Sequence, residues 1–126
     1  MVSTASDELE EHYQQGAAHR NVGKYEQAMA EFRYVLERRP DHLGARIGLG
    51  LVYGFIGMFD ESLAELQRAV ETAPESIEAR LLLAKTYCML GGYDEARSHF
   101  ERILQLDPGH AEAKKQLALI SSMQSP

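Results

Sequence analysis

The sequence has few of the features that mark a secreted or membrane-spanning protein. It contains one cysteine, Cys88, so no disulfide can form within the chain, which fits a reducing compartment. No apolar run approaches the roughly 18 residues needed to span a bilayer. Residues 1 to 11 lack the basic start and the apolar stretch of a secretory signal. We therefore expect a soluble and, by default, cytoplasmic protein.

Basic residues are in the minority. The chain has 13 Lys and Arg residues against 19 Asp and Glu residues, which gives a formal net charge of -6. A protein that binds nucleic acid usually presents a basic surface to the phosphates, so nucleic acid is not expected as a partner. The acidic excess indicates a charged surface that keeps the protein in solution.

Catalytic and metal-binding patterns are also missing. No basic residue is predictably placed to lower the pKa of Cys88, as a reactive thiol requires. His12 and His19 are two helical turns apart, about 10 Å, which is too far to chelate one metal ion on their own. No glycine-rich phosphate loop follows a predicted strand. We expect no catalytic residue, no metal site and no cofactor.

The three remaining histidines show no pattern typical of a site. His42 and His110 fall in predicted turns. His99 is expected on the outer side of its helix, among Glu95 and Arg102. None of the three is expected to take part in chemistry.

What the chain does have is an internal repeat. Pro40, Pro74 and Pro108 stand 34 residues apart, and the same kinds of side chain precede each of them. A period of this length is typical of stacked helix-turn-helix units. The residues that recur at matched offsets are Gly16, Gly50 and Ala84; Gly23, Gly57 and Gly91; Tyr25, Phe59 and Tyr93; Ala28, Ser62 and Ala96; and Phe32, Leu66 and Phe100.

Each recurring residue type has a physical role in such a unit. Small residues let two antiparallel helices approach closely, and the large residues around them fill the remaining volume. Glycines at 23, 57 and 91 are predicted to end the first helix of each pair at positive φ, and the prolines stop the second helix. Asp60 and Asp94 are expected at the start of second helices, and Asp41 and Ser76 as N-caps of the first helices that follow.

The repeated residues resemble the pattern of the tetratricopeptide repeat family. The second copy matches best, the third also matches, and the first is the loosest, with His12, Gln15-Gly16 and His19 where the family prefers an aromatic, Leu-Gly and Tyr. The matching residues are Arg46, Leu49-Gly50, Tyr53, Ser62, Leu66 and Pro74, then Arg80, Leu83-Ala84, Tyr87, Ala96, Phe100 and Pro108.

This resemblance implies an all-α fold, a right-handed superhelical α-solenoid of three antiparallel helix pairs with a capping helix. Residues 1 to 126 are expected to form a single domain. Within it we expect repeats at 9 to 42, 43 to 76 and 77 to 110, and the capping helix at 111 to 122.

The first helices of such an array line its concave side, where a binding groove is expected. An apolar stripe on these helices predicts a ligand that is an apolar or amphipathic peptide or helix. Gly44 and Gly54 are expected to leave the groove floor without side chains. The alternative is that these side chains only pack between neighbouring repeats. The predicted groove residues are Tyr13, Ala17, Arg20, Ile47, Leu51, Phe55, Leu81, Lys85 and Met89.

Some members of the family bind the acidic tails of chaperones through a clamp of Lys, Asn and Arg side chains. At the corresponding positions this chain has Tyr13, Ala17, Gly48, Glu78 and Leu82, none of which matches. The resemblance therefore implies a hydrophobic ligand and not an acidic tail.

We expect a non-catalytic protein-interaction module or adaptor with a protein or peptide partner. The first alternative is a self-assembling scaffold, a homo-oligomer in which the groove of one copy accepts part of another. The second alternative is an enzyme.

Overall fold

The computed structural model of the chain describes residues 4 to 124. Within that range it contains seven α-helices and no β-strand, which confirms the expected all-α class. The helices are α1 (Ala5–Asn21), α2 (Tyr25–Arg38), α3 (Leu43–Phe55), α4 (Phe59–Thr72), α5 (Ile77–Met89), α6 (Tyr93–Leu106) and α7 (Ala111–Gln124).

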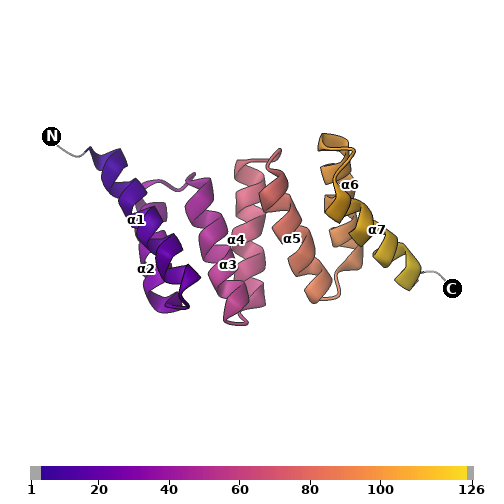
Figure 1. The fold of residues 1–126 in the computed structure, drawn as a ribbon, viewed down its shortest axis with the longest axis horizontal. Coiled ribbons are helices and arrows are strands. Elements are labelled where there is room, and N and C mark those ends of the chain that lie inside the picture. The colour runs from indigo at the N-terminus through magenta and orange to yellow at the C-terminus, as the bar shows by residue number, and fades with distance from the viewer. Residues whose placement is uncertain (1–3, 125–126) are drawn as a thin grey trace.

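The helix pairs follow one another in chain order from α1 at one end to α7 at the other, and each helix packs mainly against the next one along the chain (Figure 1). The pairs α1/α2, α3/α4 and α5/α6 form the expected α-solenoid, with α7 against the last pair. The chain zigzags, so the turns within pairs lie along the lower edge of Figure 1 and the turns between pairs along its upper edge. None of the seven helices is long and apolar enough to cross a membrane.

The three turns within pairs are built alike. Gly23, Gly57 and Gly91 have φ angles of 79°, 81° and 80°, as predicted. In each turn the residue after the glycine donates its backbone N–H to a carbonyl five residues earlier, at 2.8 Å. This left-handed geometry closes the first helix of the pair and reverses the chain.

Helices α3, α5 and α7 begin alike, but not all with the expected caps. Ser76 caps α5 as predicted, because its hydroxyl accepts the backbone N–H of Ala79. Asp41 was the wrong choice for α3: the cap is His42, whose Nδ1 accepts the N–H of Ala45 at 3.0 Å. His110 Nδ1 accepts the N–H of Ala113 in the same way. His42 and His110 stand 34 residues before and after Ser76, so the repeat itself indicated that they occupy the same cap position.

A tight contact in the core joins the first three helices. Phe32 on α2 is fully buried, and its ring lies between Gly16 of α1 and Gly48 of α3. A Cβ atom at Gly16 would lie 2.7 Å from Phe32 Cε1, and one at Gly48 would lie 2.5 Å from Phe32 Cζ. A methyl group at either position would force the ring or a neighbouring helix to shift, so the two glycines let α1 and α3 approach the ring this closely. Phe32 therefore holds its own pair together and also fixes the distance to the next pair.

Helix α7 covers the apolar side of the last pair. Ala113 and Ile120 are buried in one cluster with Phe100 and Ile103, and Leu117 packs against that cluster. The helix runs to Gln124, two residues beyond the expected end. The solvent-facing side of α7 is not wholly polar, because Leu119 and Met123 are exposed there.

Gly48 and Gly54 offer a test of this packing. Replacing Gly48 with Ala should destabilise the fold by about 1–3 kcal/mol, because the new methyl group overpacks against a ring that is also confined by Gly16. Gly54→Ala should be neutral or gain up to about 1 kcal/mol from helix propensity. At Gly54 the nearest atom, Ser62 Oγ, would lie an ordinary 3.5 Å from the Cβ. Urea unfolding measures both.

A double variant identifies the cause. Phe32→Leu shortens the ring side chain, so the free-energy loss of Gly48→Ala combined with Phe32→Leu should be smaller than the sum of the two single losses. Additive losses, or equal losses for Gly48→Ala and Gly54→Ala, would show that the contact at Gly48 does not limit the packing.

A second prediction concerns α7. A chain that stops at Gly109 should unfold at a lower temperature and self-associate, because the cluster around Phe100 and Ile103 becomes exposed. Burial of a side chain such as Ile120 stabilises by about 1.5–3 kcal/mol before the entropy of ordering the helix is subtracted. Thermal unfolding and light scattering measure the two effects.

Neighbouring residues on α7 provide the matched control. Ile120 is 2% exposed and Leu119 is 47% exposed, so Ile120→Asp should lower the unfolding midpoint sharply and Leu119→Asp should barely change it. Equal effects of the two substitutions, or an unchanged midpoint in the truncated chain, would show that α7 does not stabilise the last pair.

Candidate functional site

The structure separates the predicted groove residues into two groups. Tyr13 lies in the contact between α1 and α3: its ring covers Gly44, where a Cβ atom would lie 2.8 Å from Tyr13 Cζ. The ring centroid of Tyr13 is 4.9 Å from that of His42 and 6.0 Å from that of Phe32. Gly44 therefore accommodates Tyr13 and does not form an open groove floor.

Ile47 and Leu81 also lie in contacts between helices. Ile47 is 5% exposed and packs with Ala69 and Ala79, which places it between the second and third pairs. Leu81 is half-buried and packs against the cluster that contains Phe100. Ile47, like Tyr13, packs between neighbouring pairs, as the alternative interpretation of the stripe holds, and Leu81 packs against the cluster formed by α5, α6 and α7.

Four of the other predicted residues meet at an open apolar pocket of about 360 Å³ between α3, α4 and α5, which we name the central pocket. Leu51, Phe55, Lys85 and Met89 line it, whereas Ala17 and Arg20, half-buried on α1, do not. Gly54, which was expected in the groove floor, also lines it. The remaining lining residues were not predicted as groove residues: Gly50, Phe59, Ser62, Leu66, Leu82 and Thr86.

The central pocket exists because the middle pair has smaller side chains than its neighbours at two matched offsets. Leu66 stands where the other pairs have Phe32 and Phe100. Gly54 stands where they have Arg20 and Cys88, both with larger side chains. A comparison of the three copies, residue by residue, contained this signal. The pattern of apolar spacing within one helix did not.

The polar groups of the central pocket are satisfied by the backbone. The Ser62 hydroxyl donates to the Gly50 carbonyl at 2.7 Å, and the Thr86 hydroxyl donates to the Leu82 carbonyl at 2.9 Å. Both donors are already paired, so a ligand gains little from polar groups here. The pocket surface offered to a ligand is therefore apolar, apart from Lys85 at one side.

One aromatic side chain, Phe55, and one thioether side chain, Met89, are exposed beside the central pocket. Phe55 is 59% exposed and Met89 is 62% exposed, although the centroid of the Phe55 ring is 5.8 Å from that of Tyr25. Lys85 Nζ lies 3.7 Å from Glu112 Oε1 on α7, so its charge has a partner. An open apolar pocket with exposed apolar neighbours is suited to take up an apolar side chain.

The cysteine and the acidic and histidine side chains form no second candidate. Burial raises the pKa of the Cys88 thiol, which keeps it protonated at neutral pH. Among residues 4 to 124, no three His, Cys, Asp or Glu side chains lie together in a way that could hold a metal ion.

His99 does not lie on the outer side with Glu95 and Arg102 as expected. Its ring is half-buried and stacks on Tyr87 at a centroid distance of 5.8 Å, and its Nδ1 lies 3.1 Å from an Arg80 amino group. Arg80 is a donor only, so Nδ1 accepts and the ring is neutral. Burial and, to a lesser extent, the charge of Arg80 lower the pKa of His99.

The same position carries a polar pair in every repeat. Arg46 on α3 pairs with Glu65 on α4 at 2.8 Å, and His12 on α1 contacts Glu31 on α2. In the third pair a histidine, His99, replaces the glutamate. Arg46 and Arg80 also donate to the carbonyls of the prolines that end the preceding pairs, at 2.7 and 2.6 Å. These pairs connect helices, so we assign them to the fold and not to a ligand site.

Comparison with known proteins places this geometry among characterised folds. The family model described as tetratricopeptide repeat matches residues 22–85 and 56–120. None of the curated proteins compared with the chain matches its sequence.

Solved structures match over nearly the whole chain. The first tetratricopeptide domain of Spaghetti (RPAP3), bound to the HSP90 peptide SRMEEVD, has a TM-score of 0.87 and 20% identity, with 98% of each chain covered. The type III secretion translocator chaperone SycD of Yersinia enterocolitica has a TM-score of 0.87 and 19% identity over 97% of this chain and 98% of that one. MamA has a TM-score of 0.87 and 19% identity over 95% and 70%.

A third prediction follows from His99. Since the lowered pKa means that the folded state binds this proton less readily than the unfolded state, stability is present above about pH 6.5 and is lost as the pH falls through the lowered pKa. Between about pH 7.5 and pH 5.5 the free energy of unfolding should fall less in His99→Gln than in the unchanged chain. Urea unfolding at the two pH values measures this.

If His99→Gln and the unchanged chain lose the same free energy over that pH range, the burial of His99 beside Arg80 does not contribute to the loss.

Proposed function

The chain belongs to the tetratricopeptide repeat family, and from this we propose that it is a non-catalytic protein-interaction module or adaptor that binds an apolar or amphipathic segment of a protein partner. The segment binds at the central pocket, where one of its apolar side chains enters. Leu51, Phe55, Lys85 and Met89 contact it there. Tyr13, Ile47 and Leu81 are not part of this binding site.

The observation that carries the proposal is the combination of an apolar pocket and exposed apolar neighbours. Binding sites for small ligands typically measure about 300–1,000 Å³, so the 360 Å³ of the central pocket suits one or two side chains better than a large ligand. Phe55 and Met89 lose exposed apolar surface when a partner covers them. Because Ser62 and Thr86 are already paired, apolar burial supplies most of the affinity.

The similar structures support peptide binding in general. The RPAP3 domain is bound to a peptide of HSP90, and SycD is a secretion translocator chaperone. At two of the clamp positions the chain has no polar side chain: Gly48 lies under the Phe32 ring, and Leu82 lines the central pocket. An apolar segment therefore suits this chain better than an acidic tail.

We also propose that the chain is one domain of three repeats, 9 to 42, 43 to 76 and 77 to 110, followed by a capping helix. The matched turns and caps support these boundaries. The first repeat has one extra turn, since α1 begins at Ala5, where Thr4 and Asp7 form a reciprocal capping box.

A fourth prediction tests the central pocket. Gly54→Met should fill the pocket and weaken binding of a fluorescent amphipathic model peptide with leucines on one face, and Gly54→Ala should not. Phe55→Glu should also abolish binding while leaving the unfolding midpoint nearly unchanged, because the side chain is 59% exposed. Fluorescence anisotropy measures binding, and circular dichroism measures unfolding.

Val22→Glu is the control for Phe55→Glu. Val22 is 69% exposed but lies in the α1–α2 turn and does not line the central pocket, so this variant should bind as the unchanged chain does. Full binding by Gly54→Met and Phe55→Glu would reject the pocket as the binding site. A sharp loss of stability in Phe55→Glu would show that Phe55 acts in the core.

A further inference from the structure

The exposed apolar side chains gather on one edge of the solenoid. Of the eight large hydrophobic side chains that are exposed among the described residues, six lie in or beside the turns within pairs, and two lie on α7. Those turns share the lower edge of Figure 1. The six are Val22, Phe55, Ile56, Met58, Met89 and Leu90.

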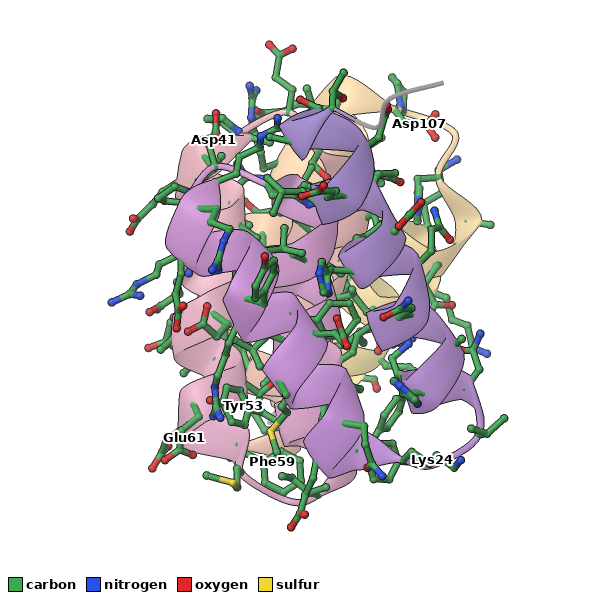
Figure 2. All side chains as sticks on the ribbon, turned by 90° about the vertical axis from the view of Figure 1, so that its left-hand side faces the viewer. Lys24, Asp41, Tyr53, Phe59, Glu61 and Asp107 are labelled. Atoms are coloured by element: carbon green, nitrogen blue, oxygen red, sulfur yellow. The ribbon has the colours of Figure 1, made fainter. Side chains whose placement is uncertain are left out.

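The opposite edge differs. None of the eight lies in the turns between pairs, residues 39 to 42, 73 to 76 and 107 to 110. Figure 2 shows the two edges, with Asp41 and Asp107 at the top and Phe59 and Glu61 near the bottom. Exposed apolar side chains at the turns within pairs, and none at the turns between pairs, are not explained by the packing of the repeats, because both kinds of turn join packed helices.

The same edge is acidic beside the central pocket. The α3–α4 turn is followed by Asp60 and Glu61, and the α5–α6 turn by Asp94 and Glu95, all four exposed. No Lys or Arg stands between residues 54 and 61 or between 88 and 95. The ion pairs among residues 4 to 124 do not involve Asp60, Glu61 or Glu95. Asp94 lies 3.7 Å from Arg97 and is 86% exposed.

The central pocket and the edge formed by the turns within pairs share residues. Phe55 and Met89 both line the central pocket and belong to the exposed apolar set, and Phe59, which also lines it, directly precedes Asp60. We name the surface of Phe55, Ile56, Met58, Met89 and Leu90 with the four carboxylates the acidic apolar edge. The central pocket therefore borders this edge.

We propose that the partner segment is basic as well as apolar: an amphipathic stretch whose apolar side chain enters the central pocket and whose Lys or Arg side chains meet the four carboxylates. This inference rests on the proposed function and adds the charge of the partner. Lys and Arg suit such a surface because their aliphatic stems cover apolar groups while the charged ends reach carboxylates. Charge complementarity of this kind selects partners and speeds association.

The same carboxylates distinguish this occupant from two others. An anionic lipid surface attracts basic protein surfaces, and an edge with four acidic side chains is repelled by it. A second copy of the chain brings a net charge of -6 to this acidic edge. The experiment below distinguishes a basic peptide from an anionic membrane and from a second copy of the chain.

The fifth prediction uses three fluorescent helical peptides of equal length: one with leucines on one face and lysines on the other, one with glutamates in place of the lysines, and one with alanines in place of the leucines. The leucine–lysine peptide should bind at least about tenfold more tightly than either of the others at low salt. Its advantage over the glutamate peptide should shrink between about 0.01 M and 0.15 M ionic strength, because salt screens exposed charges.

The matching protein variant replaces the four carboxylates by amides: Asp60→Asn, Glu61→Gln, Asp94→Asn and Glu95→Gln. It should bind the leucine–lysine peptide about tenfold more weakly than the unchanged chain. The control carries the same number of replacements near the upper edge and should bind normally: Glu37→Gln, Asp41→Asn, Glu71→Gln and Glu75→Gln, all exposed. Unfolding midpoints confirm that both variants remain folded.

The outcomes separate this inference from the proposed function. If Gly54→Met abolishes binding but the lysine and glutamate peptides bind equally, the pocket stands and the basic partner is rejected. Equal losses in the two four-residue variants also reject it. If Gly54→Met binds both leucine peptides normally, the proposed function itself fails. If the protein floats with vesicles of anionic lipid, the edge binds a membrane and the basic partner is rejected. If the molecular mass of the protein in solution grows with concentration and Phe55→Glu abolishes this growth, the edge binds a second copy of the chain.

Discussion

The arrangement of this solenoid depends on how closely a large side chain of one second helix can approach two first helices. Phe32 shows the limit, since its ring lies between Gly16 and Gly48 with no room for a methyl group on either side. This contact sets the spacing within the first pair and also the spacing to the second pair. The central pocket lies where the middle pair makes the equivalent contact with different side chains.

In the middle pair a smaller side chain, Leu66, makes the contact that Phe32 makes in the first pair. Leu66 is smaller than Phe32, and a Cβ atom at Gly50 would lie 3.0 Å from it, so the backbones still approach closely there. Gly54 leaves the end of α3 without a side chain, and the polar groups nearby are bonded to backbone carbonyls. The result is a pocket that is apolar and open. The candidate site thus lies where Leu66 and Gly54 are smaller than the residues at the same offsets of the other repeats.

Charge is distributed according to the same geometry. Polar pairs between helices, such as Arg46 with Glu65, lie in equivalent positions along the array and hold each pair together. The carboxylates in the first turns of α4 and α6 stabilise those helices through the macrodipole and remain exposed. The turns within pairs all reach one edge (Figure 1). These carboxylates therefore gather on the same edge as the exposed apolar side chains Phe55 and Met89, which line the pocket. A local preference for acidic residues at helix starts therefore becomes a feature of the assembled surface.

The sequence by itself determined the all-α class, the positive φ of the three turn glycines, the cap at Ser76 and the helix pairs, because these depend on local backbone chemistry repeated every 34 residues. Tertiary structure decided which side of the first helices stays open. Tyr13, Ile47 and Leu81 share the apolar stripe with Phe55, yet they are covered by neighbouring helices, whereas Phe55 is exposed near the turn. Spacing within a helix defines a face but not the position of the next helix along it. That position is set by contacts between pairs, such as Tyr13 on Gly44 and Phe32 on Gly48.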